Sequence, residues 1–255
     1  MDKTKQKIAF SFLIAIFLAA FEGVVVSTAA PVIVKSLHNF KMISWIFSIF
    51  LLTSAISTPI YGKLADLYGR KRIFMIGISI FLFGSLLAGL SQTMHQLIIF
   101  RGIQGIGAGA IFTIGFTMIG DIFTLEERSI IQGAISTIWG IAGLVGPLLG
   151  GFLIDYLSWQ WIFFINIPFG LLSVYILAKF VHEQKPATNP KIDYLGAILL
   201  SIAIGSLLYG VMSLDEDFYL GVILLVITLI SSILFYIQEA RTSEPIVPLL
   251  SLIHI

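Results

Sequence analysis

The sequence predicts an all-α polytopic membrane protein, and three observations point to this fold class. The chain of 255 residues is 58% hydrophobic and only 11% charged, whereas soluble domains carry about 25% charged residues. Its mean hydropathy of +1.01 is too high for a surface that faces water. Apolar runs of about 20 residues, the length that crosses the hydrocarbon as a helix, recur along the whole chain. Lipid is therefore the expected main solvent.

The composition also excludes several classes of function. The net charge of +1 argues against a nucleic-acid partner. The chain contains no cysteine, which excludes disulfides, thiolate catalysis and cysteine-based metal sites. The signatures of zinc proteases, serine hydrolases and phosphate-binding loops do not occur. We therefore expect no enzyme, no cofactor and no bound metal.

Eight windows of the chain are long and apolar enough to span a bilayer. Turn-forming or charged pairs such as His38-Asn39 and Asn189-Pro190 separate them. The first window follows three lysines, as in a signal peptide, but it is too long for the apolar region of one. The predicted spans cover residues 8–34, 43–61, 73–93, 96–119, 130–153, 160–180, 194–213 and 218–237.

Basic residues decide the predicted orientation. The stretch 62–72 carries five charges between two nearly uncharged flanks, and basic residues in short loops stay on the cytoplasmic side. With the N-terminus inside, Lys35 and Lys41 fall outside and Arg101 falls within a span. The cytoplasmic segments then hold 12 of the 15 basic residues: Lys3, Lys5, Lys7, Lys63, Arg70, Lys71, Arg72, Arg128, Lys179, Lys185, Lys191 and Arg241. Both ends of the chain are thus predicted to lie on the cytoplasmic side of the cell membrane.

A short internal repeat suggests how the first six spans are related. Residues 62–66 read GKLAD and residues 151–155 read GFLID, three spans later. Because three is odd, the two copies fall on opposite sides of the membrane, and only the inner copy continues into basic residues. This pattern is typical of a three-plus-three inverted repeat, although a five-residue echo can also arise by chance.

Five short motifs are distributed over the predicted spans and the segments that join them. Glu22 is followed by Ala29-Ala30-Pro31 in the first span, and Trp159–Pro168 reads WQWIFFINIP. Arg101–Gly109 reads RGIQGIGAG in the fourth span, and Gly146–Gly151 reads GPLLGG in the fifth. The 62–72 stretch contains Gly62, Leu64, Asp66, Gly69, Arg70 and Lys71.

In these motifs the chain resembles the major facilitator superfamily, and specifically its fourteen-helix drug:proton antiporters. It departs from the family pattern at Leu67, where a basic residue is usual. The resemblance implies a six-helix transporter half with its following loop in residues 1–193. It implies two additional membrane helices in 194–238 and a cytoplasmic linker in 239–249. The family members continue with six more helices, so the missing C-terminal half is an expected partner.

The last six residues are expected to be foreign to the protein. Leu250–Ile255 can be written back as CTG TCT CTT ATA CAC ATC, the sequence of a transposase mosaic end used in sequencing libraries. Residues 250–255 are therefore predicted to be a non-native tail on a truncated fragment. The alternative is a genuine start to the next helix.

Glu22 is the first candidate for the chemistry of the protein. It lies in the middle of the first span, with no other charge between Lys7 and Lys35. A carboxylate in that position is costly, so burial favours its neutral form and it should face a cavity or a partner. Such a residue can carry a proton across the membrane, and a cationic drug can compete for it. The alternative is a structural glutamate bonded between helices.

Arg101 is the second candidate. A guanidinium does not deprotonate in proteins, so it must be paired or must reach the membrane surface with its long side chain. The resemblance implies that Arg101 tunes the protonation of Glu22 or passes protons to it. We expect no direct pair, because the two residues are placed about a turn apart in depth.

Two further groups of residues are candidates for conformational roles. Residues of the charged stretch are predicted to form a cytoplasmic gate, in which the glycines allow tight turns. The resemblance implies Asp121 as a partner of the basic residues. The alternative is a plain turn that only fixes the topology. The gate comprises Gly62, Asp66, Gly69, Arg70, Lys71, Arg72 and Asp121. The second group is predicted to form a close-packed seam of the antiporter type, and it comprises Gly146, Pro147, Gly150 and Gly151. The alternative is ordinary helix packing.

The sequence as a whole predicts a secondary transporter that exports lipophilic or cationic drugs in exchange for protons. Its expected partners are a small lipophilic substrate, protons and membrane lipids. One rival is a carrier of the same fold for another solute, such as a siderophore, a fatty acid or an amino acid. The other is a non-transporting membrane sensor or scaffold.

Overall fold

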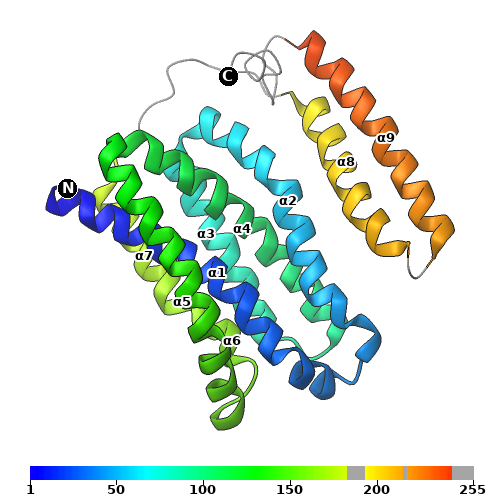
Figure 1. Ribbon diagram of the computed structural model, residues 1–255, viewed down its shortest axis with the longest axis horizontal. Helices are drawn as coiled ribbons and strands as arrows, with labels where there is room; N and C mark the ends of the chain where they lie inside the picture. The colour runs from blue at the N-terminus through cyan, green and yellow to red at the C-terminus, as the bar shows by residue number, and fades with distance from the viewer. Residues whose placement is uncertain (183–192, 215–216, 243–255) are drawn as a thin grey trace.

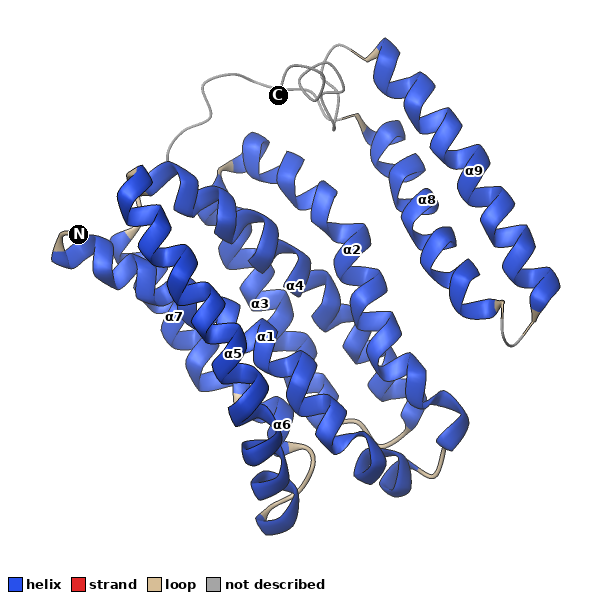
Figure 2. Ribbon diagram, viewed as in Figure 1, coloured by secondary structure: helices blue, strands red, loops and turns tan. Residues whose placement is uncertain are grey.

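The computed structural model describes residues 1–182, 193–214 and 217–242. In these ranges the regular structure is helical throughout and contains no strand (Figure 2), which confirms the predicted fold class. The elements are α1 (Lys3–Leu37), η1 (Phe40–Met42), α2 (Ile43–Tyr68), α3 (Arg70–Gly89), α4 (Met94–Ile122), α5 (Leu125–Tyr156), α6 (Trp161–Phe164), α7 (Asn166–Phe180), α8 (Tyr194–Ser213) and α9 (Phe218–Arg241).

Among the described residues, eight helical segments are long and apolar enough to cross a membrane, at the eight predicted places. Most helices extend beyond the predicted windows, because helical hydrogen bonding continues past the last apolar residue. The sixth span is divided into α6 and α7 at Ile165. Pro168 has no N–H to donate to the carbonyl of Phe164, which accounts for the break.

Three sequence predictions concern residues without a structural description. The linker 239–249 is described only as far as Thr242. The tail 250–255 lies outside the described residues, as does most of the loop between α7 and α8.

The helices form a bundle with an additional helical pair at one side (Figure 1). Helix α1 packs against α4, α5 and α7, while α3 and α2 both pack against α4. Helices α8 and α9 run side by side and join the bundle through α8 and α2. The ring of Tyr209 on α8 lies edge-on to Trp45 on α2, with the ring centroids 5.4 Å apart.

The two ends of the bundle differ in charge. Helices α2 and α3 meet at one end, where α4 also meets α5, and Lys5, Arg70 and Arg128 all make polar contacts there. We call this the basic end.

The core consists of two apolar clusters, one above the other along the bundle. The cluster nearer the basic end contains Phe12, Phe74 and Phe81, and the other contains Val25 and Ile33. Five buried polar residues lie where the two clusters meet: Glu22, Ser85, Arg101, Gln104 and Asn166. We call these five residues the polar layer.

Candidate functional site

An ion pair lies at the centre of the polar layer. Nη1 of Arg101 on α4 donates a hydrogen bond of 2.6 Å to Oε1 of Glu22 on α1. The side chains are 1% and 0% exposed, so Arg101 does not reach the membrane surface. The expectation that the two residues do not pair directly is wrong, because the long arginine side chain compensates for their different positions along the helices.

Arg101 has further partners that offset the cost of its burial. Its Nε donates to the carbonyl of Ile46 on α2 at 3.2 Å, and Nη1 also donates to Oε1 of Gln104 at 2.7 Å. The ring of Phe50 lies 4.3 Å from the guanidinium carbon, at cation–π distance. Buried charges persist only when they are paired and hydrogen-bonded, and Arg101 meets both conditions.

Three neutral residues complete the polar layer. Nδ2 of Asn166, the first residue of α7, donates to Oε2 of Glu22 at 2.6 Å and to Oγ of Ser85 at 2.9 Å. Nε2 of Gln104 also donates to Ser85 Oγ, at 3.2 Å. Ser85 in turn donates to the carbonyl of Phe163 on α6 at 2.9 Å. Both carboxylate oxygens of Glu22 thus accept from a side chain, and five spans contribute atoms to the network.

The site residues predicted from the sequence do not include Ser85, Gln104 or Asn166. Both amides do lie inside the quoted motifs: Gln104 is three residues after Arg101, and Asn166 is two residues before Pro168. An amide in the middle of an apolar span was the signal that could have identified them.

The charged stretch 62–72 is not an extended loop. Helix α2 continues through Gly62 and Asp66 to Tyr68, and α3 begins at Arg70. Gly69 alone connects them, with φ 94°, a left-handed value that side chains rarely adopt. The predicted tight turn at Gly62 is therefore wrong, whereas a turn does occur at Gly69.

Several predicted gate residues meet at the basic end. Arg70 pairs with Asp121 at the end of α4 and lies 3.5 Å from Oδ1 of Asp66, one helical turn earlier. Nζ of Lys71 donates to the carbonyls of Ala178 at 2.9 Å and Val181 at 2.6 Å, at the end of α7. Arg72 follows on α3. These contacts join α2, α3, α4 and α7 at one level.

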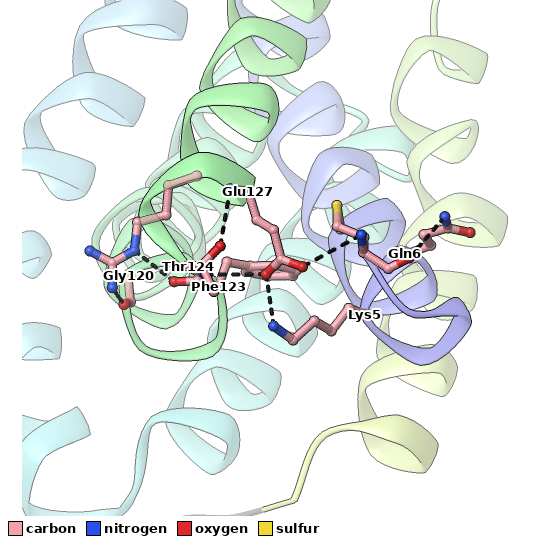
Figure 3. Close-up of polar contacts among 8 residues, drawn as sticks. Lys5, Gln6, Gly120, Phe123, Thr124 and Glu127 are labelled. Atoms are coloured by element: carbon pink, nitrogen blue, oxygen red, sulfur yellow. Dashed lines mark hydrogen bonds and ion pairs between the residues drawn. The ribbon is translucent and has the colours of Figure 1, made fainter.

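A second set of contacts joins α1 to the start of α5 at the same end (Figure 3). Nζ of Lys5 donates to Oε2 of Glu127 at 2.7 Å. Thr124 and Glu127 form a capping box, in which each side chain accepts from the backbone N–H of the other. Arg128 donates to the carbonyls of Gly120 and Phe123, which fixes the turn between α4 and α5.

The antiporter-type motif lies on the side of α5 that faces α1. A Cβ at Gly146 would come within 2.8 Å of Val24, and one at Gly150 within 3.0 Å of Val25. Glycines at these two positions therefore permit the close approach of the helices. Gly151 has no atom within 4 Å of such a Cβ, and Pro147 is exposed. The motif is thus divided between a packed face and an open face.

Comparison with known proteins agrees with this architecture. The family model described as Major Facilitator Superfamily matches residues 12–244. "Multidrug resistance protein 3" of Bacillus subtilis is 38% identical, over 97% of this chain and 50% of that protein. "Multidrug transporter protein MdtP" of the same organism is 37% identical, over 93% of this chain and 44% of that protein. The chain therefore spans about half the length of these relatives.

Solved structures show the same fold at low sequence identity. The POT family transporter PepTSo superposes with a TM-score of 0.61 at 14% identity, covering 93% of this chain and 55% of that chain. The human organic anion transporter MFSD10 gives a TM-score of 0.60 at 15% identity, covering 94% of this chain and 72% of that chain. The family model, the relatives and these folds agree with the eight apolar helices: the chain is a multi-pass membrane protein and belongs to the Major Facilitator Superfamily, a family of transporters rather than of enzymes.

Proposed function

We propose that this chain is the N-terminal part of a transporter that exports lipophilic, cationic drugs in exchange for protons. The observation that carries the proposal is the carboxylate of Glu22, which is fully buried in the middle of a membrane span and bonded to Arg101. The names of the two Bacillus subtilis relatives support drug transport as the activity.

The chemistry of the exchange follows from two opposed effects on Glu22. Removal from water favours the neutral carboxyl, while Arg101 and Asn166 favour the carboxylate. A proton that arrives from outside therefore competes with the existing partners, and a cationic drug that arrives from inside competes with the proton. Alternating exposure of the site to the two sides then exchanges one cation for the other.

A second six-helix half is part of the proposal. Few residues of α2 and α5 are buried, whereas most residues of the spanning parts of α1 and α4 are buried. The exposed apolar surface of these two helices includes Leu51 on α2 and Trp139, Leu144 and Leu148 on α5. We propose that the second half covers part of it, and that the substrate binds between the halves. Because alternating access requires both halves, residues 1–255 alone are expected not to transport.

The contacts at the basic end are proposed to act as a gate. Arg70, Asp66, Asp121 and Lys71 hold four helices together there, and separating these helices would open the bundle toward that side. Their predicted orientation puts the gate on the cytoplasmic face of the cell membrane. Closure would then correspond to the outward-facing state.

The decisive test is Glu22→Gln in the intact transporter, reconstituted in liposomes with an imposed pH gradient. The amide keeps the size of the side chain but cannot release a proton, so drug transport driven by the gradient should fall to the background rate. Glu126→Gln, at an exposed position on α5, is the matched control and should transport normally.

Three outcomes would count against the proposal. Normal gradient-driven transport by Glu22→Gln refutes the role of the carboxylate. Transport of another class of solute, with no response to drugs, favours a different carrier of the same fold. No transport by the wild-type protein, with the protein correctly inserted, favours a sensor or scaffold.

A further inference from the structure

Asn166 is the residue through which the sixth span contacts the ion pair. It is fully buried and begins α7, directly after the break that separates α7 from α6. Its Nδ2 makes two hydrogen bonds, to Glu22 and to Ser85. Its Oδ1 is buried and has no hydrogen-bond partner among the described residues. Unsatisfied buried acceptors are uncommon in folded proteins, so this atom requires an explanation.

The hydrogen-bond pattern around Glu22 is that of an ionised carboxylate. An ionised carboxylate only accepts, and here Oε1 accepts from Arg101 while Oε2 accepts from Asn166. A protonated carboxyl must donate at one oxygen. Arg101 has no acceptor, and an N–H of Asn166 cannot accept either. Protonation would therefore place two donors against each other unless the amide of Asn166 turns.

We propose that Asn166 is a positioning residue that distinguishes the ionised from the protonated form of Glu22. With Glu22 ionised, Nδ2 donates to Oε2, as in this structure. With Glu22 protonated, the amide turns by about 180° and Oδ1 accepts from the new O–H, since the two ends of an asparagine amide have nearly the same shape. The inference rests on the proposed role of Glu22 as the proton carrier.

The same rotation would reach the helix break. Ser85 accepts from Asn166 and donates to the carbonyl of Phe163 on α6. When the amide turns, its Oδ1 faces Ser85, whose O–H can then donate to it in place of the Phe163 carbonyl. Protonation of Glu22 would thus loosen the contact between α3 and α6 beside the break.

The surroundings of Glu22 allow a pH effect to be assigned to it. Among the described residues that pack around it, Arg101 from α4 is the charged group that contacts the carboxylate. Helices α3 and α7 contribute Ser85 and Asn166, while α2 contributes the carbonyl of Ile46 that binds Arg101. Helix α5 faces α1 through Gly146 and Gly150.

The test is the pH profile of drug transport by the intact transporter in liposomes, with Asn166→Leu. Leucine removes the donor to the carboxylate, so the protonated form of Glu22 should persist to higher pH. Loss of a hydrogen bond to a charged group shifts the midpoint of a pH profile by about one pH unit or more, which is a tenfold change in apparent proton affinity. The midpoint should therefore move by about that amount toward alkaline pH. A residue with a merely structural role would lower the rate and leave the midpoint unchanged.

Ser173→Ala is the matched control. Ser173 is fully buried on α7 and its Oγ donates to the carbonyl of Ser11 on α1 at 2.9 Å, so it joins the same two helices without contacting Glu22. This variant should keep the wild-type midpoint. Asn166→Ser serves as a second variant should Asn166→Leu fail to accumulate in the membrane. Its short hydroxyl cannot maintain the contact with Glu22, so the same direction of shift is expected.

Each outcome bears on a different statement. A pH-dependent wild type with an unmoved midpoint in the Asn166 variants overturns the inference and leaves the proposed function intact. An equal shift in Ser173→Ala also overturns it, because loosening α1 from α7 would then explain the effect. A wild type whose drug transport does not depend on pH overturns the proposed function itself.

Discussion

Two ion pairs of this chain differ in their exposure to water. Glu22 and Arg101 are at most 1% exposed, whereas the side chains of Arg70 and Asp121 are 33% and 36% exposed. Removing one partner of a buried pair typically costs about 3–5 kcal/mol, but an exposed pair contributes about 0–1 kcal/mol. The exposed pair can therefore separate and re-form at little cost, as the proposed gate requires, whereas neutralising one partner of the buried pair costs several kcal/mol.

At the residue scale, we expect Asp121→Asn to lower the maximal rate of drug transport about two- to tenfold. The change removes the charge that pairs with Arg70 and should hardly affect stability, since an exposed pair contributes little. The measurement is initial transport rate and drug affinity of the intact transporter. Asp155→Asn makes the same chemical change at an exposed site near the end of α5 that is remote from the basic end, and should leave the rate unchanged. A normal rate in Asp121→Asn would remove the support for a gate.

The sequence was informative for charged residues and less so for neutral polar ones. Glu22 and Arg101 could be identified because charge inside an apolar span is rare and costly. Serines and threonines are common in spans, and many satisfy themselves within one helix, as Ser27 does at the carbonyl of Val24. Ser85 could therefore not be distinguished from Ser27 before the helices were packed.

At the scale of the elements, glycines bring α3 and α4 into direct backbone contact. A Cβ at Gly107 would lie 2.3 Å from the backbone nitrogen of Phe81 and 2.6 Å from the carbonyl oxygen of Gly77. Because these atoms belong to the backbone, no side-chain rotation can make room. The G-x-x-x-G spacing of Gly105 and Gly109 has the same effect on the opposite side, against α2.

We expect Gly107→Ala to destabilise the bundle by about 1–3 kcal/mol, the usual cost of overpacking a core. Thermal unfolding of the chain in detergent, followed by helical circular dichroism, measures this effect as a lower midpoint temperature. Gly120→Ala on the same helix is the control, since no atom lies within 4 Å of its Cβ, and alanine is the better helix former. Equal midpoints for the two variants would contradict the packing argument.

Helix ends were the least predictable elements. The charged stretch 62–72 marks the edge of the apolar region, and it suggested a loop there. Helix α2 nevertheless continues through most of it, because charge fixes where a helix leaves the lipid and not where its hydrogen bonding stops. The positive φ of Gly69 ends the helix instead.

At the scale of the whole molecule, the asymmetric charge predicts one orientation in the cell membrane. Because the chain has no cysteine, single cysteines can report on it directly. In intact cells, a membrane-impermeant maleimide should label Gln92→Cys, in the exposed connection between α3 and α4. It should label Ser129→Cys, near the basic end, only after the cells are permeabilised. Labelling in the reverse order would refute the predicted orientation and, with it, a cytoplasmic gate.

The amino-acid sequence by itself determined the solvent, the number of spans and the buried charges of this protein. Apolar length and rare charge are local properties, and a membrane acts on them directly. The tertiary structure decided which polar groups meet. The pairing of Glu22 with Arg101, and the contact of Asn166 with both Glu22 and Ser85, depend on how four helices pack. The sequence distance between Glu22 and Asn166 is 144 residues, so no local pattern contains that contact.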